Sequence, residues 1–515
     1  MAPLGPIAGP TPALVFIGFM GAGKSRAARS AREAGLEAFD TDELLERELG
    51  CSIDDYFDRE GEGEFRRREA ALASELLHRA DGGVIALGGG SVLSDTVREA
   101  LRRHVVVWLE VDAETSWQRV EGRRPLARDR ERFDALFTER VPYYESLADA
   151  ILPGDSESVR RALPSLLALR DLPAARLAWG RSASGEYPVF FGRDLLGSFW
   201  PHDGEPFCVT DSDVGPLLAD RLGPVARRVV IAAGERAKTW AGAERVLADL
   251  ARLGVNRSDH LAALGGGVVG DLAGFCAATY QRGIDVVQVP TTLVAQVDSA
   301  YGGKTGVDLP EAKNYVGAYH QPAAVLTDPA TLATLPRAEL AAGFVEVIKT
   351  ALIVGGGLWE RVRAIEELDP DDLDELIFAC VRRKLDVVAA DERDAGPRQV
   401  LNLGHTVGHA VEAATGYRRY RHGEAVGIGL LAALRLSDAD ELRGEVAALL
   451  SRHGLPTELS AEVDPDAVLA ALERDKKRTS AGLGFVLLER PGEPRPGQPV
   501  DPGRVRAAVS EMVAR

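Results

Sequence analysis

The 515-residue chain contains little cysteine: four residues, at positions 51, 208, 276 and 380, with no C-x-x-C pair. This scarcity excludes a disulfide-stabilised scaffold and favours a reducing compartment, so we expect a cytoplasmic location. The chain also lacks an uncharged apolar run of about 18 residues, which predicts that no segment spans a membrane. Its apolar N-terminal segment has no basic stretch and runs into a glycine-rich motif, which argues against a signal peptide.

Basic residues are in deficit: 61 Lys and Arg stand against 78 Asp and Glu, giving a formal net charge of −17. Broad nucleic-acid binding needs a basic face, so this balance argues against it. Net charge does not exclude a local basic pocket for a small anion. We therefore expect small-molecule ligands, and neither nucleic acid nor membrane as a partner.

Apolar runs that end in glycine recur along the first 330 residues, as in ALVFIGF, GVIALGGG and HLAALGGG. Strands that alternate with helical segments predict an α/β fold with parallel sheets. Beyond residue 330 helical patterns dominate, and the Pro/Gly-rich segment 491–503 is expected to be an irregular loop. Because one domain rarely exceeds ~250–300 residues, we expect a phosphate-loop parallel-sheet domain (1–170), a dinucleotide-binding α/β lobe (175–330) and a mostly helical lobe for metal and substrate (331–515).

Residues 18–25, GFMGAGKS, match G-x-x-x-x-G-K-[ST] between an apolar strand and a helical segment. In this setting the backbone N–H groups of the loop surround nucleotide phosphates. Lys24 would reach the β- and γ-phosphates, and Ser25 would bind Mg²⁺. The motif predicts nucleotide binding but does not identify the acceptor of a phosphoryl group.

Several later residues are candidates for binding that acceptor. Asp40-Thr-Asp42 follows an apolar segment; read as strand residues, the two carboxylates would project to the same side. One would hold Mg²⁺ and the other would bind or deprotonate a hydroxyl group; the alternative is that they only cap the next helix. Glycines 88–90 end a strand where a ligand can approach the backbone. Three arginines, one helical and two in arginine–proline segments, suit a lid or a carboxylate clamp: Arg66, Arg124 and Arg140.

The ordered set G-F-M-G-A-G-K-S, D-T-D, E-F-R, G-G-G, R-P-L and R-V-P-Y-Y over residues 18–144 resembles the shikimate kinases. The resemblance implies phosphorylation of shikimate by Mg²⁺·ATP, with catalytic roles for Lys24, Asp42 and Arg124. It implies Mg²⁺ at Ser25 and Asp40, and ATP at Gly21, Ala22, Gly23, Lys24, Ser25, Arg26 and Arg124. It implies shikimate at Asp42, Arg66, Gly88, Gly89, Gly90 and Arg140. Ala127 departs from the second leucine that is common after R-P-L.

The second half has its own glycine-rich turn, GGGVVGD at residues 265–271, after a strand and before a helix. It satisfies G-x-G-x-x-G, which is consistent with a dinucleotide pyrophosphate site but weak by itself in a glycine-rich chain. Residues 280–322 are rich in small, hydroxyl and cationic residues and poor in large apolar ones. This composition suits a polar cleft for an anionic substrate better than a core.

Three of the nine histidines, His405, His409 and His422, fall within eighteen residues. His405 and His409 are four apart, so they share one face of a helix. Two histidines with Glu346 would leave a coordination position open, as in catalytic zinc sites. The spacing leaves open which two histidines bind.

The ordered motifs G-E-x-x-K, G-G-G-x-x-x-D, P-T-T, D-S-A-Y-G-G-K-T-G, E-V-I-K, L-N-x-G-H-T-x-G-H and H-G, over residues 175–515, resemble the 3-dehydroquinate synthases. The resemblance implies conversion of 3-deoxy-D-arabino-heptulosonate 7-phosphate to 3-dehydroquinate, with NAD⁺ and Zn²⁺ or another divalent ion such as Co²⁺. It implies zinc on Glu346, His405 and His422, and catalytic roles for Lys304, Lys349 and His409. It implies NAD⁺ at Asp211, Glu235, Lys238, Gly266, Gly267, Asp271, Thr291, Thr292, Asp298 and Lys313. It implies the phosphorylated substrate at Arg282, Lys304, Asn314, Lys349, Lys384, Arg398, Asn402, His409 and Lys476.

The expected protein is thus a two-enzyme fusion for aromatic amino acid biosynthesis, forming a homodimer through its synthase unit. Leu403, where an aromatic residue is commoner, departs from the family beside the site. A rival hypothesis is a phosphate-loop nucleotide sensor fused to a metal- and NAD-dependent polyol dehydrogenase, which would produce NADH and has no need for so many phosphate-seeking cations. Lys24, Asp42 and Arg66 argue against the sensor.

Overall fold

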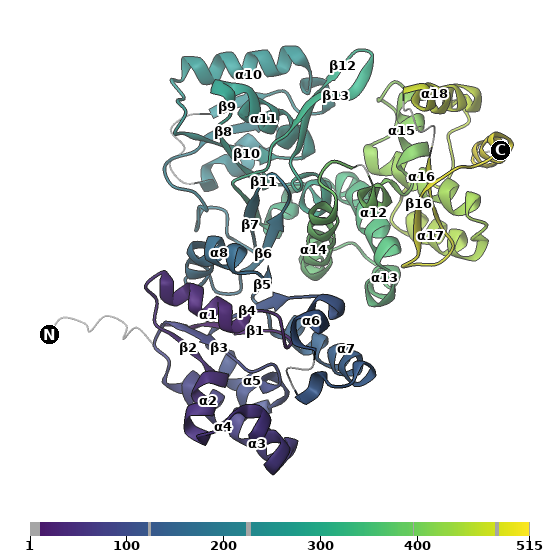
Figure 1. The fold of residues 1–515 in the computed structure, drawn as a ribbon. Helices are drawn as coiled ribbons and strands as arrows, with labels where there is room; N and C mark the ends of the chain where they lie inside the picture. The colour runs from purple at the N-terminus through teal and green to yellow at the C-terminus, as the bar shows by residue number, and fades with distance from the viewer. Residues whose placement is uncertain (1–10, 122–124, 223–227, 395, 479–483, 514–515) are drawn as a thin grey trace. The chain divides into compact units, whose positions relative to one another are not determined.

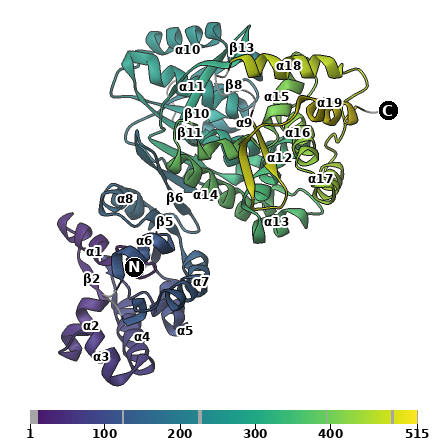
Figure 2. The ribbon, with the colours of Figure 1, turned by 45° about the vertical axis from the view of Figure 1, so that its right-hand side comes forward.

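The computed structural model describes residues 11–121, 125–222, 228–394, 396–478 and 484–513, with the backbone alone for 125 and 475–478. The chain forms two compact units: residues 1–179 with 188–190, and residues 180–187 with 191–515. Figures 1 and 2 show the ribbon of both. The three domain ranges expected from the sequence remain predictions. No helix among the described residues is long and apolar enough to cross a membrane.

The first unit contains a parallel sheet with the strand order β2-β3-β1-β4-β5. Apart from the short β2, which is only partly buried, the strands are buried apolar runs, as expected where helices cover both faces. Their bounds are β1 Leu14–Ile17, β2 Ala38–Asp40, β3 Val84–Ala86, β4 Val105–Glu110 and β5 Ala150–Pro153. The helices are α1 Lys24–Glu33, α2 Thr41–Leu49, α3 Ile53–Glu60, α4 Glu62–Arg79, α5 Asp95–Leu101, α6 Ala113–Val120, α7 Arg130–Leu147 and α8 Ser156–Leu169.

This strand order explains where the first site lies. The phosphate loop follows β1, Asp40 ends β2, and glycines 88–90 follow β3. Because β2, β3 and β1 are parallel neighbours, their carboxyl ends lie along one edge of the sheet. Three motifs that are far apart in sequence therefore meet there.

The second unit contains a parallel sheet with the order β14-β11-β10-β8-β9. Its bounds are β8 Phe207–Asp211, β9 Arg228–Ile231, β10 His260–Gly265, β11 Asp285–Pro290 and β14 Ala324–Thr327. Two antiparallel hairpins accompany it: β12 Lys304–Leu309 with β13 Ala312–Tyr319, and β15 Phe485–Leu488 with β16 Pro494–Gln498. Strands β6 Arg176–Arg181 and β7 Glu186–Phe191 lie where the two units divide the chain.

Helices dominate after residue 330, as the sequence predicted (Figure 1). Those of the second unit are α9 Gly215–Leu218, α10 Trp240–Arg252, α11 Gly267–Thr279, α12 Arg337–Val354, α13 Gly356–Arg363, α14 Asp374–Ala390, α15 His405–Ala414, α16 His422–Leu436, α17 Asp440–Arg452, α18 Pro465–Arg478 and α19 Pro502–Glu511. Helix α12 is buried from Leu340 to Ile353, charged residues included. The expected α/β class with a helical C-terminal part is confirmed.

One local expectation is wrong. The Pro/Gly-rich segment 491–503 is not a plain loop, because Pro494–Gln498 forms β16. Proline is compatible with this strand since β16 is an edge of a two-stranded hairpin and needs few N–H donors.

Candidate active sites

The first unit encloses a cavity of about 530 Å³ at the carboxyl edge of its sheet. The phosphate loop, the end of β2, helix α4 and the glycine loop after β3 all contribute to its wall. Its lining includes Gly21, Gly23, Lys24, Ser25, Arg26, Asp40, Asp42, Arg66, Gly89, Gly90 and Arg140. These residues were predicted from five separated motifs, and the fold brings them to one cavity.

Lys24, at the start of α1, donates from Nζ to the carbonyl oxygens of Gly18 (2.8 Å) and Phe19 (3.0 Å). Gly23 precedes α1, and no side chain among the described residues caps the helix. The N-terminal N–H groups of an uncapped helix attract phosphate. The loop therefore suits the phosphates of a nucleotide. Arg124 lies outside the described residues.

The two carboxylates of Asp40-Thr-Asp42 do not share a strand, contrary to expectation. Asp40 ends β2, and Asp42 lies in the first turn of α2. Asp40 Oδ1 accepts from the N–H groups of Asp42 (2.9 Å) and Glu43 (3.4 Å), so the helix cap is present. Its Oδ2 is buried without a hydrogen-bond partner among the described residues. A buried anionic oxygen without a donor is costly, which fits a bound cation such as Mg²⁺.

Two arginines, Arg140 buried and Arg66 half-buried, face the same cavity. Arg140, on α7, is 2% exposed, and Arg66 lies on α4 with Nη1 2.6 Å from Glu69 Oε2. The Nε–H groups of both arginines are buried and have no acceptor in the part of the chain that the structure describes. Burial also lowers the pKa of Arg140. Guanidinium groups with unused donors suit a planar carboxylate.

Gly90, in the loop after β3, leaves room for the guanidinium group of Arg66. A Cβ built on Gly90 would lie 2.1 Å from Arg66 Nη1, so a side chain would displace the guanidinium group. On the other side, Tyr144 donates to the carbonyl oxygen of Gly89 (2.5 Å). Thr41 Oγ1 donates to the carbonyl oxygen of Ala86 (3.2 Å) and accepts from the N–H of Gly88 (2.9 Å). These bonds hold the glycine loop against the end of β2.

In the second unit, Glu346, His405 and His422 converge from α12, α15 and α16. Each offers a ligand atom, and the three atoms lie within 4.8 Å of one another. Glu346 Oε1 is 3.5 Å from His405 Nε2 and 3.6 Å from His422 Nε2. His409 also lies nearby, with its ring 5.3 Å from that of His405. It forms a second possible ligand set with Glu412 and His422.

The chemistry of this cluster fits a metal ion. Both carboxylate oxygens of Glu346 are buried, and neither has a hydrogen bond of good geometry among the described residues. The contact of Oε2 with Lys349 Nζ (2.5 Å) is an ion pair. Despite complete burial, Lys349 and the two histidines hold the pKa of Glu346 well below its usual value. Burial and Lys349 lower the pKa of His405 to about 3, which keeps its ring neutral and able to bind a cation.

Close helix packing builds the cluster. A Cβ on Gly423 would lie 1.8 Å from the carbonyl oxygen of Ala342, so only glycine lets α16 approach α12 this closely. Glu424 accepts from the backbone N–H of Arg421 (2.8 Å) and caps α16 just before His422. The Arg421 side chain pairs with Glu339 of α12 (2.7 Å). The start of α16 is thereby fixed beside the helix that carries Glu346.

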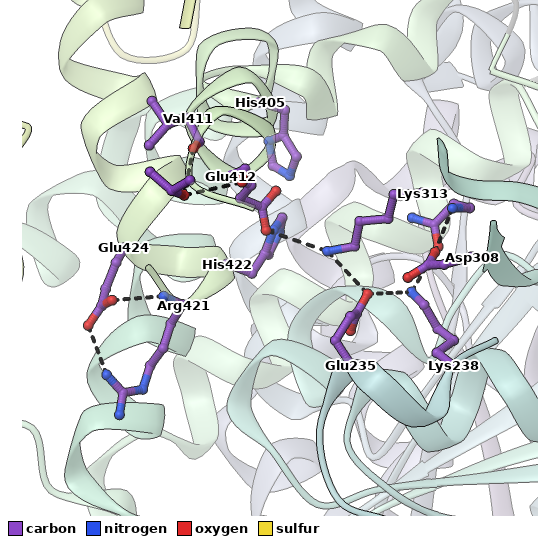
Figure 3. Close-up of polar contacts among 12 residues, drawn as sticks. Glu235, Lys238, Asp308, Lys313, His405, Val411, Glu412, Arg421, His422 and Glu424 are labelled. Carbon is purple, nitrogen blue, oxygen red and sulfur yellow. Dashed lines mark hydrogen bonds and ion pairs between the residues drawn. The ribbon is translucent and has the colours of Figure 1, made fainter. Parts of the chain in front are cut away.

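A chain of alternating charges leads from this cluster to the α/β part of the same unit (Figure 3). Glu412 Oε1 lies 3.4 Å from His422 Nδ1 and 3.4 Å from Lys313 Nζ. Lys313 pairs with Glu235 (3.1 Å), and Glu235 pairs with Lys238 (3.0 Å). Lys238 continues to Asp271 (3.2 Å) and to the side-chain oxygen of Asn314 (2.8 Å). Predicted NAD⁺ and substrate residues thus share one network with the metal cluster.

Other predicted NAD⁺ residues line the carboxyl edge of the second sheet. Gly266 and Gly267 begin α11 directly after β10, and no side chain caps this helix. Thr291 and Thr292 follow β11, and Thr291 Oγ1 is buried without a partner in the described chain. Asp211 ends β8, where Oδ1 accepts from the N–H groups of the next turn. An uncapped helix beside the unused hydroxyl group of Thr291 fits a pyrophosphate.

Of the residues predicted to bind the substrate, two lysines lie near Asp298. Lys384 pairs with the half-buried Asp298, and although desolvation raises the pKa of Asp298, the charges of Lys384 and Lys349 hold it below the usual value. This places Asp298, expected at NAD⁺, among the expected substrate cations.

Lys304 pairs instead with Asp394 (2.6 Å). Buried Arg398 donates to the carbonyl oxygen of Glu392 (2.5 Å), and it shares the 3₁₀ turn Pro397–Asn402 with Asn402. Arg282 is exposed, and within the described ranges it makes no ion pair with the charge network. Lys476 lies in α18, but its side chain is outside the described set.

Sequence reasoning missed Glu412 and Glu69. Glu412 lies three residues after His409 and seven after His405, so helical spacing alone places all three on one face. Glu69 likewise follows Arg66 by three residues and is buried. A buried carboxylate one turn from a predicted cation or ligand is the signal that was available.

Three family models match the chain: shikimate kinase over residues 20–169, 3-dehydroquinate synthase N-terminal over 228–342, and 3-dehydroquinate synthase C-terminal over 343–478. The 3-dehydroquinate synthase of Symbiobacterium thermophilum is 43% identical over 350 residues, which make up 63% of this chain and 98% of that protein. The enzyme of Halorhodospira halophila is 44% identical over 336 residues, or 62% and 94%.

Among solved structures, 2-deoxy-scyllo-inosose synthase in complex with carbaglucose-6-phosphate, NAD⁺ and Co²⁺ is 26% identical, with a TM-score of 0.57. The match covers 65% of this chain and all of that one. These findings confirm the family resemblances seen in both halves of the sequence. The chain belongs to the 3-dehydroquinate synthase family and carries a shikimate kinase domain ahead of its synthase unit.

Proposed function

We propose that the chain catalyses two reactions in aromatic amino acid biosynthesis. The first unit phosphorylates shikimate to shikimate 3-phosphate with Mg²⁺·ATP. The second converts 3-deoxy-D-arabino-heptulosonate 7-phosphate to 3-dehydroquinate and phosphate. The observation that carries the proposal is a pair of buried polar sets without hydrogen-bond partners in the described part of the chain: the Nε–H groups of Arg66 and Arg140, and the carboxylate of Glu346 between two histidines.

In the kinase unit, the cationic and the anionic residues bind different parts of the two substrates. Arg66 and Arg140 grip the shikimate carboxylate, which orients the ring. Asp42, which lines the same cavity, binds the ring hydroxyls and accepts the proton of the attacking one. Asp40 Oδ2 and Ser25 hold Mg²⁺, and Lys24 leaves its two carbonyl partners to neutralise the transferred phosphoryl group.

In the synthase unit, Glu346, His405 and His422 hold Zn²⁺, with Co²⁺ as a possible substitute. Glycines 266 and 267, Thr291, Thr292 and the Glu235–Lys238–Asp271 set hold NAD⁺. When bound, these two groups supply hydroxyl polarisation and reversible hydride transfer. Lys349, Lys384 and Arg398 hold the anionic substrate, joined by Lys304, Asn314, Asn402, Arg282 and Lys476. His409, beside the cluster, transfers a proton to or from the bound substrate.

The proposal is tested by two assays on the full chain. One measures phosphate release from the heptulosonate phosphate with zinc and catalytic NAD⁺; the other measures ADP release with and without shikimate. Lys24→Ala should abolish only the second activity, and His405→Ala should abolish only the first together with zinc binding. Net NADH production from a simple polyol, or ADP release that ignores shikimate, would instead support the dehydrogenase or sensor hypothesis.

The proposal includes two further features. The synthase unit forms a homodimer, which light scattering would test. The protein works in the cytoplasm, which the four free cysteines support. Fractionation of cells would test it.

A further inference from the structure

We infer that Glu412 is a positioning residue with two roles. It holds the ring of His422 in the orientation that a metal needs, and it anchors Lys313 of the β12–β13 hairpin to the metal cluster. The inference rests on the proposed metal set of Glu346, His405 and His422. Glu412 belongs neither to the sequence motifs that resemble the synthases nor to that ligand set.

The geometry places His422 between two carboxylates. Its Nε2 lies 3.6 Å from Glu346 Oε1, and its Nδ1 lies 3.4 Å from Glu412 Oε1. Glu412 is 4% exposed, and its second oxygen is buried without a hydrogen-bond partner among the described residues. The ring therefore directs Nε2 toward Glu346 and Nδ1 toward the buried carboxylate of Glu412, which Figure 3 draws beside His422.

This arrangement selects one tautomer. A neutral imidazole that binds a metal through Nε2 carries its proton on Nδ1, and that N–H needs an acceptor. Glu412 is the acceptor for His422. For His405 the acceptor is a backbone group instead, because its Nδ1 lies 3.2 Å from the carbonyl oxygen of Leu403. Of the two histidines, only His422 depends on a side chain that substitution can remove.

The second role of Glu412, the contact with Lys313, links it to the proposed nucleotide-binding part of the unit. Lys313 Nζ lies between Glu412 (3.4 Å) and Glu235 (3.1 Å), and Glu235 also pairs with Lys238. Lys313 is largely buried, so its ammonium needs both anions. Without the charge of Glu412, Lys313 would keep, of its ion pairs with described residues, only the one with Glu235, which Lys238 also engages.

A competing arrangement uses Glu412 as a ligand, because His409, Glu412 and His422 also form a possible metal set. The structure favours positioning for two reasons. His409 is exposed, whereas Glu346 and His405 are buried. Lys313 contacts the same Glu412 oxygen, Oε1, that faces His422, whereas Lys349 contacts Oε2 of Glu346 and leaves its Oε1 facing the Nε2 atoms of His405 and His422.

The test measures binding in the full chain, not turnover. Zinc affinity is determined by competition with a chromophoric chelator, and stoichiometry by elemental analysis. Glu412→Gln preserves shape and should weaken zinc binding about 10- to 100-fold at unchanged stoichiometry. Titration of the zinc-free variant should also show weaker NAD⁺ binding. Glu445→Gln, an exposed carboxylate on α17, is the matched control and should match the parent protein in both measurements.

Two more variants separate the possible failures. His405→Ala should lose zinc and His409→Ala should keep it. If His405→Ala loses zinc while Glu412→Gln binds it like the parent, the inference is overturned and the proposed metal set stands. If His405→Ala keeps full zinc affinity, the metal set itself is wrong. If His409→Ala loses zinc together with Glu412→Gln, Glu412 is a ligand. Unchanged NAD⁺ affinity in Glu412→Gln would overturn the link through Lys313.

Discussion

Gly423 of α16 packs against the carbonyl oxygen of Ala342 in α12, with space for no atom between them: a Cβ there would lie 1.8 Å from the oxygen. The obstacle is backbone, so no change of rotamer relieves it. The residue before Gly423 is His422 and the residue four after Ala342 is Glu346. The distance between two proposed ligands is therefore controlled by the absence of a side chain.

Gly423→Ala should push α16 from α12, weaken zinc binding by at least tenfold and destabilise the synthase unit by about 1–3 kcal/mol, the usual cost of overpacking. Shikimate-dependent ADP release should not change. Gly444→Ala, where an added Cβ meets nothing within 4 Å, is the control. Zinc titration and urea unfolding provide the measurements, and parental zinc affinity in Gly423→Ala would contradict the packing argument.

In the kinase unit, Gly90→Ala should raise the KM for shikimate about tenfold or more, a loss of about 1.4 kcal/mol of binding. The new methyl group would meet the flexible end of Arg66, not backbone, so the fold should tolerate it. The KM for ATP should stay within a factor of two to three. Gly63→Ala on α4 meets nothing within 4 Å and serves as the control. Equal effects on both substrates would show that Gly90 supports the fold and not the Arg66 grip.

Asp40 carries two roles that substitution can separate, because its two oxygens do different things. Asp40→Asn keeps an acceptor for the N–H groups of α2, so stability should change by less than about 0.5 kcal/mol, yet the Mg²⁺ requirement should rise and kcat should fall. Asp40→Ala should show the same loss and cost about 1 kcal/mol more stability. Kinetics at varied Mg²⁺ and thermal unfolding distinguish the two. Normal Mg²⁺ dependence in Asp40→Asn would leave the carboxylate as a cap only.

His260 makes the synthase unit sensitive to acid. Its Nε2 accepts from Trp200 Nε1 (2.9 Å), and its ring stacks on His202 at 4.0 Å. Burial, with His202 next, lowers the pKa of His260 from 6.5 to about 4, although Asp285 opposes this. Between pH 6.5 and 4 the unfolded chain binds the proton and the folded one does not, so stability falls as the pH falls. Across that window the loss approaches about 3 kcal/mol.

The measurement is urea unfolding at several pH values for the parent and His260→Phe, which keeps the stack but does not titrate. The parent's advantage should be fully present above pH 6.5 and should shrink toward pH 4. Parallel stability curves for the two proteins would rule out His260 as the source.

The sequence by itself determined the ligand chemistry. The G-x-x-x-x-G-K-S loop, the D-T-D segment, the G-G-G turn and the helical pair His405 and His409 are local patterns, because backbone geometry and helical spacing act over a few residues. It also determined the α/β class, since buried parallel strands read as apolar runs.

The tertiary structure decided which of these groups meet. Spacing left open which two histidines join Glu346, and only the packing of α12, α15 and α16 places His405 and His422 with Nε2 toward it. Packing also made Asp298 a partner of Lys384 and brought Glu412 between His422 and Lys313. Such contacts join residues tens of positions apart, and they depend on helix approach distances that no local pattern encodes.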